Sequence, residues 1–255
     1  LKLYDKVGNV MRVAVVAAYK SQVVASAVKE RRLIMGRRAL QQFENEYQLN
    51  IISGYTGSNK TGIIHELKKQ NEPVIDLEKL AEHKGSAFGN LDLVPQPSQE
   101  YFENILALEL FKLNLSHPKK SIWIEDESQR IGQVNIPTSF FKLMRSSPIL
   151  FITVPFELRL NHIIEGYGKF EKEKLINAII RIKKKLGGLE TKQAINFLLE
   201  DDVKSCFSEL LKYYDKQYIK GRAKRDNIED GITQLFYKTT QAQLNATDLI
   251  NYVRK

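Results

Sequence analysis

The chain has 255 residues, of which 43% are hydrophobic, and a formal net charge of +9, so it is long enough for one large domain with a sizeable core. No apolar stretch approaches the roughly 20 residues that a membrane-spanning helix requires, and no signal peptide is visible, so we expect a cytoplasmic protein with no membrane association. The single cysteine, Cys206, excludes a disulfide framework and a cysteine-based metal site.

Positive charge is concentrated at the beginning of the chain. Residues 1–45 carry nine Lys or Arg against three Asp or Glu, and residues 23–43 interleave cations with apolar positions at helical spacing. This pattern predicts a basic helical segment over residues 1–46. Such a segment can bind a polyanion such as RNA, or it can be an ordinary solvated helix face. The candidate RNA-binding residues are Arg31, Arg32, Arg37 and Arg38.

A glycine-containing motif follows the apolar run at residues 49–52. Residues 54–61 read Gly-Tyr-Thr-Gly-Ser-Asn-Lys-Thr, whereas a phosphate-binding loop requires Gly, four residues, then Gly-Lys-Ser/Thr. Gly54, Lys60 and Thr61 fit this pattern, and Asn59 occupies the place of the second glycine. Asn is the non-glycine residue that best tolerates left-handed backbone angles, so the motif is weakened but kept. The alternative is an ordinary Gly/Ser-rich turn between a strand and a helix.

The residues of this loop have distinct expected parts in holding a phosphate. Backbone N–H groups, including those of Gly57 and Ser58, would point at phosphate oxygens. Lys60 would place a point charge at the outer phosphates, and the Thr61 hydroxyl is the expected ligand of Mg²⁺. The helix that begins near Lys60 would direct its positive end at the same anion.

Strand and helix patterns alternate around the loop. Strands are predicted over residues 49–52, 72–77, 121–124 and 149–154, and helices over residues 61–70, 99–115 and 137–145. This alternation predicts an α/β fold of the P-loop NTPase type, with a parallel sheet in a three-layer core over residues 47–156.

The rest of the chain is mostly helical in pattern. Residues 157–228 are predicted to form an inserted helical layer, in which Leu175, Ile179, Ile182 and Leu186 make one stripe that ends at Gly187-Gly188. Residues 229–255 are predicted to rejoin the core, with a strand over 233–237 and a helix over 246–253.

Carboxylates follow two of the predicted strands. Glu125, Asp126 and Glu127 come after the strand at 121–124, and Asp76 and Glu78 come at the end of the preceding one. In open parallel sheets ligands bind at the carboxyl ends of the strands. We expect Glu125 or Asp126 near Mg²⁺ and Glu127 in the following turn, because successive strand side chains alternate in direction. Asp76 or Glu78 would act on Mg²⁺ or as a base; the alternative for the acidic stretch at 125–127 is a solvent-exposed turn.

A second candidate anion-binding loop lies at residues 81–89. It reads Ala-Glu-His-Lys-Gly-Ser-Ala-Phe-Gly, so His83, Lys84 and Ser86 stand beside two glycines. Backbone N–H groups of such a loop can bind an anion, although the same pattern is typical of a plain surface loop. The remaining histidines show no metal-ligand spacing, and Cys206 lies in a helical apolar stripe that indicates a buried small hydrophobe.

Several blocks of the chain together resemble the ATPase-type domain of the tRNA 2-selenouridine synthase family. They are the phosphate-binding loop, residues 74–89, residues 96–103, residues 124–132 and residues 213–218, and they occur in the family's order between residues 47 and 255. The His-Lys-Gly-Ser-Ala-Phe-Gly block at 83–89 and the Glu-Asp-Glu-Ser block at 125–128 are the most specific of them. The phosphate-binding loop alone would not identify the family.

The resemblance implies a substrate and two reactions. The substrate is 2-thiouridine at the wobble position of tRNA, whose sulfur receives a geranyl group from geranyl diphosphate and is then replaced by selenium from selenophosphate. In this assignment the loop at 54–61 holds diphosphate, and Glu125 or Asp126, with Asp76, positions Mg²⁺. His83, Lys84 and Ser86 line the substrate side, and Arg159 and the basic helices contact tRNA.

The chain departs from the family pattern at three places. Lys84 stands where the family usually has Arg, which replaces a bidentate anion clamp by a point charge. Asn59 replaces a glycine. Nothing before residue 47 matches the family's N-terminal rhodanese-like domain with its reactive cysteine, so we expect a separate rhodanese-like subunit, a fragment, or the geranyl step alone.

Two other functions use the same residues. A small-molecule or RNA kinase, or an ATPase, would bind ATP at the same loop and carboxylates. A phosphate-dependent RNA-binding subunit would have no chemistry of its own.

Overall fold

The computed structural model describes residues 41–83, 95–222 and 231–254, and in residues 220–222 only the backbone. The chain divides into two compact units, residues 1–45 and residues 46–255, and the fold described below is that of the second. Most of the predicted basic helical segment, including Arg31, Arg32, Arg37 and Arg38, lies outside the described residues.

A five-stranded parallel sheet forms the centre of this unit, which confirms the predicted α/β class. Its strands are ordered β2 (Val74–Ile75), β3 (Ile122–Glu125), β1 (Leu49–Gly54), β6 (Ile149–Thr153) and β7 (Ile232–Phe236). All four pairings are parallel. The inner strands are nearly continuous runs of buried residues, as expected when helices cover both faces of a parallel sheet.

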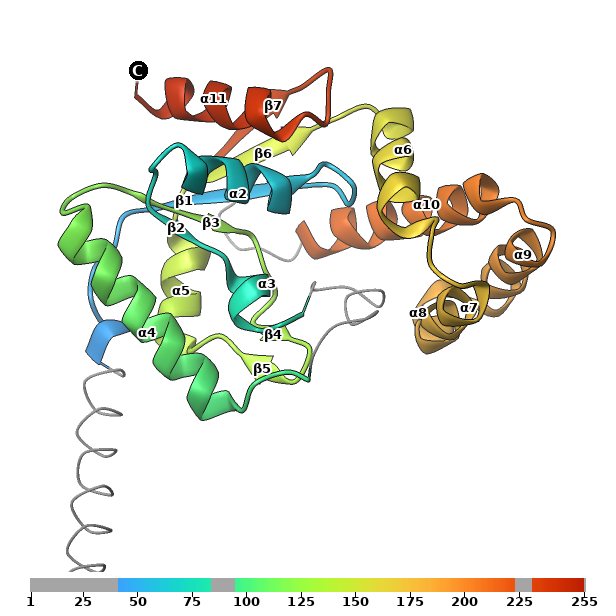
Figure 1. Ribbon diagram of the computed structural model, residues 1–255, viewed down its shortest axis with the longest axis horizontal. Coiled ribbons are helices and arrows are strands. Elements are labelled where there is room, and N and C mark those ends of the chain that lie inside the picture. The colour runs from blue at the N-terminus through green and yellow to red at the C-terminus, as the bar shows by residue number, and fades with distance from the viewer. Residues whose placement is uncertain (1–40, 84–94, 223–230, 255) are drawn as a thin grey trace, which may run out of the picture. The chain divides into compact units, whose positions relative to one another are not determined.

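Helices cover both faces of the sheet, so the core has the three layers that the sequence predicts. Helices α2 (Lys60–Lys69) and α11 (Ala242–Val253) lie on one face, and α4 (Gln99–Ser116) and α5 (Thr138–Ser146) lie on the other (Figure 1). Apolar side chains of α2 and α11 bury those of the sheet face beneath them. This cluster includes Ile52, Ile63, Leu67, Leu150, Ile152 and Leu249.

Residues 156–222 form a helical layer with a core of its own. It consists of α6 (Phe156–Tyr167), α7 (Lys172–Arg181), α8 (Lys183–Leu186), α9 (Gly188–Leu199) and α10 (Val203–Arg222). The buried side chains of this core come from all five helices; among them are Leu160, Leu175, Ile179, Leu186, Leu198 and Phe207. Because α6 follows β6 directly, the layer is attached where that strand ends (Figure 1).

The predicted single stripe from Leu175 to Leu186 is wrong in one respect, because two helices carry it. The chain departs from helical geometry at Ile182, which ends α7 and precedes α8. Gly187, with φ +110°, separates α8 from α9, whereas Gly188 is the first residue of α9 rather than part of a terminator. The apolar spacing is continuous although the backbone is not.

Two further elements differ from prediction. The strand predicted over 72–77 is reduced to Val74–Ile75, because the Asp76 carboxylate accepts from the backbone N–H of Lys79 and caps the short helix α3 (Leu77–Leu80). The hairpin of β4 (Arg130–Ile131) and β5 (Val134–Asn135) was not predicted. Among the described residues no helix is both long and apolar enough to cross a membrane.

Candidate functional site

A cavity of about 880 Å³ lies between the carboxyl end of the sheet and the helical layer. Its walls come from the phosphate-binding loop, the ends of β1 and β3, and helices α2, α5, α6 and α10. Its size falls within the roughly 300–1,000 Å³ of typical small-molecule sites. It also lies where open parallel sheets bind ligands.

Asn59 adopts the conformation that the motif requires. Its backbone angles, φ 59° and ψ 37°, are left-handed, as expected for a residue in the position of a glycine. The Asn59 side chain donates a hydrogen bond of 2.8 Å to the carbonyl oxygen of Thr240 and does not cap the helix that it precedes. The substitution thus keeps the loop geometry and attaches the loop to the segment before α11.

The beginning of α2 has features of an anion-binding helix terminus. No side chain of the N-cap residue accepts a hydrogen bond from the first turn, and the first turn holds no acidic residue. The N–H groups and the positive end of the helix dipole therefore face the cavity without a competing carboxylate from their own helix. The structure brings Gly54, Gly57, Asn59, Lys60 and Thr61 to one wall of the cavity, whereas Ser58 is buried behind it.

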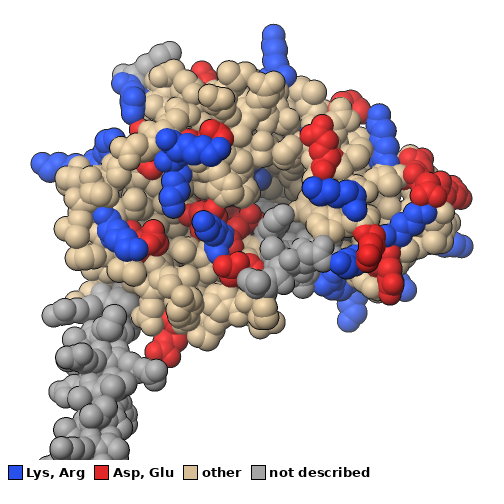
Figure 2. Space-filling view, in the orientation of Figure 1, with Lys and Arg blue, Asp and Glu red and all other residues tan. Residues whose placement is uncertain are grey.

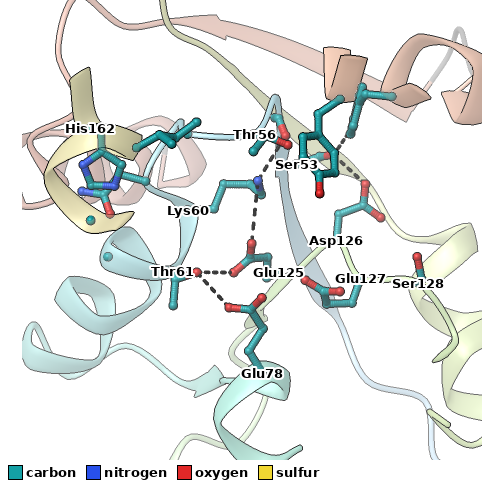
Figure 3. A pocket seen from close by; sticks show the side chains of 18 of the residues that line it. Ser53, Thr56, Lys60, Thr61, Glu78, Glu125, Asp126, Glu127, Ser128 and His162 are labelled. Carbon is teal, nitrogen blue, oxygen red and sulfur yellow. Dashed lines mark hydrogen bonds and ion pairs between the residues drawn. The ribbon is translucent and has the colours of Figure 1, made fainter. Parts of the chain in front are cut away.

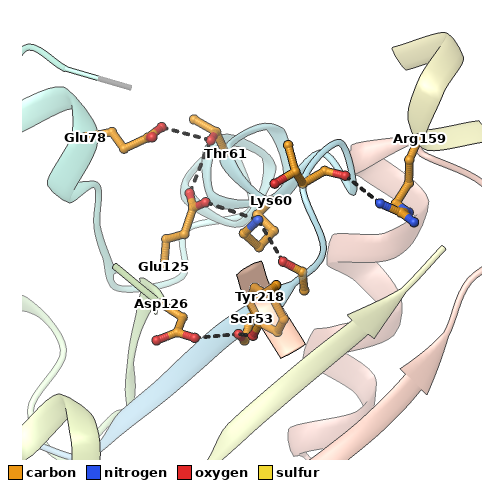
Figure 4. Close-up of polar contacts among 10 residues, drawn as sticks. Ser53, Lys60, Thr61, Glu78, Glu125, Asp126, Arg159 and Tyr218 are labelled. Atoms are coloured by element: carbon orange, nitrogen blue, oxygen red, sulfur yellow. Dashed lines mark hydrogen bonds and ion pairs between the residues drawn. The ribbon is translucent and has the colours of Figure 1, made fainter. Parts of the chain in front are cut away.

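The Lys60 ammonium is held by groups of the site itself. It donates to the carbonyl oxygen of Gly54 at 3.1 Å and lies 3.7 Å from a carboxylate oxygen of Glu125 (Figure 4). A phosphate in the loop would offer the same cation a doubly charged partner.

The Thr61 hydroxyl faces two carboxylates. It lies 3.1 Å from Glu78 and 3.2 Å from Glu125, and the carboxylate of Glu127 lies beside them (Figure 3). Glu125 is the last residue of β3, and Glu78 lies in α3, which follows the neighbouring strand β2, so both acids reach the same edge of the sheet.

Burial and mutual repulsion raise the pKa values of these three glutamates. Burial, then the charge of Glu125, raises the pKa of Glu78 to about 7. Burial, then the charges of Glu125 and Glu78, raises the pKa of Glu127 to about 8. Burial also raises the pKa of Glu125, although Lys60 and Thr61 oppose the shift. Groups whose pKa values lie near neutrality can exchange protons or accept a cation at working pH.

Asp126 belongs to a separate set of contacts. Its carboxylate accepts from Ser53 at 2.5 Å and lies 3.4 Å from the guanidinium of Arg145 on α5. Ser53 also contacts the hydroxyl of Tyr218 on α10 (Figure 4). The structure therefore places Glu125 and Glu78, rather than Asp126, at the Thr61 hydroxyl that we expected to bind Mg²⁺.

The donor set around Thr61 fits a hard cation such as Mg²⁺. Hydroxyl and carboxylate oxygens are its preferred ligands, and in phosphate sites it takes one or two protein ligands and completes its shell with phosphate and water. Within the described part of the chain, no group of three or more His, Cys, Asp and Glu residues is arranged to hold a metal ion by itself.

Arg159 is not available to tRNA, which corrects its predicted role. It is 4% exposed, and its guanidinium donates to the carbonyl oxygens of Val154 and Thr56 and to both carboxylate oxygens of Asp215. The ring of Tyr55 lies under the same group, 5.0 Å from its central carbon. Arg159 thus anchors the phosphate-binding loop to α6 and α10.

The other predicted residues lie around the cavity or outside the described residues. Asp76 caps α3 and lies 2.8 Å from His65, so it does not line the cavity. His83 ends the described part of its loop, and burial lowers its pKa. Lys84 and Ser86 lie outside the described residues.

Figure 2 shows Lys and Arg side chains interspersed with Asp and Glu over the visible face. On that face the described residues present no continuous basic surface that would identify a tRNA-binding site.

The cavity also contains residues that the sequence did not single out. Ser53 was detectable, since a buried polar residue at the end of an apolar strand is unusual. Tyr218 lies in the block at 213–218 that resembles the family, but it was not assigned to the site. Arg145, His162 and Tyr167 were not assigned to it either, because they reach the site from helices far apart in the sequence.

A family model described as the tRNA 2-selenouridine synthase AAA domain matches residues 47–234. The tRNA 2-selenouridine synthase of Nitrosomonas europaea is 43% identical over 128 residues, which are 50% of this chain and 33% of that protein. The enzyme of the same name from Bdellovibrio bacteriovorus is 33% identical over 227 residues, covering 74% of this chain and 59% of that protein.

Among solved structures, a shikimate kinase from Bacteroides thetaiotaomicron is 12% identical and covers 82% of this chain and 99% of its own, with a TM-score of 0.36. The two curated relatives described above are longer than the chain, which spans one third to three fifths of their length. The family match covers most of the chain and includes the phosphate-binding loop and the acidic strand end. The chain belongs to the tRNA 2-selenouridine synthase AAA domain family.

Proposed function

We propose that this protein is a tRNA-modifying transferase that acts on 2-thiouridine, with the cavity at the phosphate-binding loop as its diphosphate site. The observation that carries the proposal is the arrangement at the beginning of α2. There Lys60, Thr61 and the uncapped N–H groups of the helix lie beside the glutamates Glu78 and Glu125. The chain that holds this arrangement belongs to the tRNA 2-selenouridine synthase AAA domain family. Its curated relatives are named for forming 2-selenouridine in tRNA.

In the first reaction the sulfur of 2-thiouridine attacks C1 of geranyl diphosphate. The new C–S bond takes its electrons from sulfur, and the electrons of the broken C–O bond leave with diphosphate. Loss of the N3 proton gives a neutral S-geranyl nucleoside. Lys60 and the loop N–H groups would stabilise the charge that develops on diphosphate, which is where the largest catalytic contribution is expected.

A bound Mg²⁺ would add Lewis-acid stabilisation of the leaving diphosphate. Thr61 would hold the ion directly, and Glu125 and Glu78 would hold it directly or through water. The carboxyl group of Glu127 would adjust the charge around Glu78 and Glu125. Asp126 would position the part of the cavity wall beside these glutamates through its contacts with Ser53 and Arg145. His83, Lys84 and Ser86 would line the nucleoside side.

In the second reaction selenium replaces the S-geranyl group. Selenophosphate and one water are consumed, and geranyl thiol and phosphate are released, which balances the atoms. We propose that this step needs a separate rhodanese-like subunit or further domain to deliver selenium. The tRNA contacts are assigned to Arg31, Arg32, Arg37 and Arg38.

The test is to incubate the protein with 2-thiouridine-containing tRNA, geranyl diphosphate and Mg²⁺, and to digest the tRNA for nucleoside mass spectrometry. The proposal predicts S-geranyl-2-thiouridine with the wild-type protein, and little or none with Lys60→Ala. Absence of this product from wild-type protein that binds the tRNA would exclude the geranyl step. ATP hydrolysis or phosphoryl transfer without S-geranyl product would instead favour the kinase or ATPase alternative.

A further inference from the structure

One wall of the cavity differs chemically from the phosphate side. Helix α6 contributes His162, Ile163, Gly166 and Tyr167, and α10 contributes Tyr214, Gln217 and Tyr218. Ile163 and the three tyrosines are large apolar or aromatic residues, and His162 and Gln217 are the polar members of this wall, whereas the opposite wall holds Lys60, Thr61 and the glutamates. The loop side of the cavity is thus charged and polar, whereas the helical side is mainly aromatic and apolar.

The two walls meet at the loop glycine Gly57. A methyl group at Gly57, with φ +83°, would lie 2.8 Å from the carbonyl oxygen of Arg159 and 2.9 Å from Cδ1 of Ile163. The phosphate-binding loop therefore touches α6 at Ile163. Gly166 and Tyr167 come about one helical turn further along the same helix.

Two of the three tyrosine hydroxyls of this wall are buried or in contact with a protein group. The hydroxyl oxygen of Tyr214 is buried, and that of Tyr218 contacts Ser53 at the end of β1. Burial lowers the pKa of His162, which favours its neutral form, in which the ring still offers one donor and one acceptor but no charge. A nucleobase needs partners for its polar edges, and leaving them unpaired is costly, whereas a hydrocarbon needs none.

Gly166 leaves open space in this wall. A methyl group built at Gly166 meets no atom within 4 Å, although glycine in a helix is less favourable than alanine by about 1 kcal/mol. Gly188, the first residue of α9, also has open space, but it does not line the cavity. A methyl group at position 166 would therefore extend into open space without displacing protein atoms.

We propose that the wall formed by Ile163, Gly166, Tyr167, Tyr214 and Tyr218 is the subsite for the hydrocarbon chain of a prenyl diphosphate, and that Gly166 determines the accepted chain length. This inference rests on the proposed function, because it assumes diphosphate at Lys60 and Thr61. It adds the part of the site that distinguishes a prenyl diphosphate from ATP and from inorganic diphosphate.

The test is calorimetric titration of the full chain, with Mg²⁺, using geranyl diphosphate, dimethylallyl diphosphate and inorganic diphosphate. The wild-type protein is expected to bind geranyl diphosphate at least about tenfold more tightly than inorganic diphosphate, because burial of methylene groups adds affinity. Gly166→Leu is expected to weaken geranyl diphosphate at least about tenfold and to leave inorganic diphosphate unchanged. It should shift the preference toward the shorter dimethylallyl chain.

Gly188→Leu is the matched control, since it makes the same change at an open helical glycine outside the cavity. It should leave all three affinities unchanged, and thermal unfolding should show that both variants are folded. Equal affinity of wild-type protein for geranyl and inorganic diphosphate would overturn the subsite, as would equal weakening of both by Gly166→Leu. Those results leave the proposed function standing; binding of neither diphosphate would overturn both.

Discussion

The guanidinium of Arg159 donates two hydrogen bonds to the carboxylate of Asp215, at 2.8 and 2.9 Å, and so joins helix α6 to helix α10. The same guanidinium donates to the carbonyl oxygen of Thr56 in the phosphate-binding loop. One buried ion pair therefore fixes the two helices that form the apolar wall and the loop that faces them.

Arg159→Ala is expected to lower the free energy of unfolding by about 3–5 kcal/mol, because it leaves the Asp215 carboxylate without its buried partner. Arg159→Lys should rescue only part of this loss, since a lysine cannot make the bidentate contact. Urea denaturation followed by circular dichroism measures both. Lys204→Ala is the control, because its pair with Glu157 is two thirds exposed, and it should change little. If Arg159→Ala left stability unchanged and abolished tRNA binding, Arg159 would contact tRNA and would not stabilise the fold.

Substitutions of Asn59 separate backbone strain from side-chain bonding. Asn59→Gly keeps the left-handed conformation and removes only the bond to Thr240, whereas Asn59→Ala adds strain of about 1–2 kcal/mol. We expect Asn59→Ala to unfold at lower denaturant concentration than Asn59→Gly, and to bind geranyl diphosphate more weakly. Asn71, with φ 60°, is the matched control outside the cavity: Asn71→Ala should lower stability without changing that affinity. Equal stability of Asn59→Ala and Asn59→Gly would contradict the strain argument.

The raised glutamate pKa values predict a pH dependence of stability in EDTA. Glu78 and Glu127 have folded-state pKa values of about 7 and about 8, above the ordinary value of 4.5. The folded state therefore binds more protons than the unfolded state between these values, so stability falls as pH rises from about 4.5 to about 8. The groups facing Glu127 are Glu125, Glu78, Asp126 and Lys60.

Glu127→Gln should flatten this dependence, because the amide cannot ionise. Thermal unfolding at several pH values from 5 to 8.5 provides the measurement, and Glu190→Gln, on the distant helix α9, is the control. The same slope in wild-type protein and Glu127→Gln would show that this carboxyl does not titrate in that range.

Lys60→Ala is expected to reduce geranyl transfer by about 10²–10³-fold in kcat/KM, the usual effect of removing one group that stabilises developing charge. Lys69→Ala changes an exposed lysine of the same helix and should have no effect. Retention of activity in Lys60→Ala would place the diphosphate elsewhere.

Replacing Arg31, Arg32, Arg37 and Arg38 together by Ala is expected to weaken tRNA binding. The slope of log affinity against log salt should fall by about 0.7–0.9 for each tRNA phosphate that the variant no longer neutralises. Filter binding over a range of salt concentrations measures both quantities. If replacing Lys183, Lys184 and Lys185 by Ala decreased the affinity for tRNA more than replacing the four arginines does, the tRNA-binding surface would lie at α8.

Local patterns predicted most of the core. The strands are apolar runs that are buried on both faces, and the glycine, lysine and threonine of the loop at 54–61 have a fixed spacing. Residues close together in the sequence were therefore enough to predict these elements. Predictions failed where a single side chain decided the outcome: the Asp76 carboxylate ends β2 by capping α3, and Ile182 interrupts a helix whose apolar spacing continues.

Within the site, the sequence indicated which carboxylates follow the strands but not which of them meet Thr61. Glu78 does so because α3 turns it back toward β3, whereas Asp126 is directed to Ser53 and Arg145. Nor could Arg159 be recognised as buried, since its partner Asp215 lies 56 residues away on another helix.

The most direct measurement is a crystal structure of the protein soaked with geranyl diphosphate and Mg²⁺. Diphosphate density is expected against residues 54–61, within hydrogen-bonding distance of Lys60 Nζ, and hydrocarbon density is expected along Ile163, Gly166 and Tyr167. Diphosphate bound away from this loop, or a hydrocarbon chain directed away from α6 and α10, would contradict this binding mode.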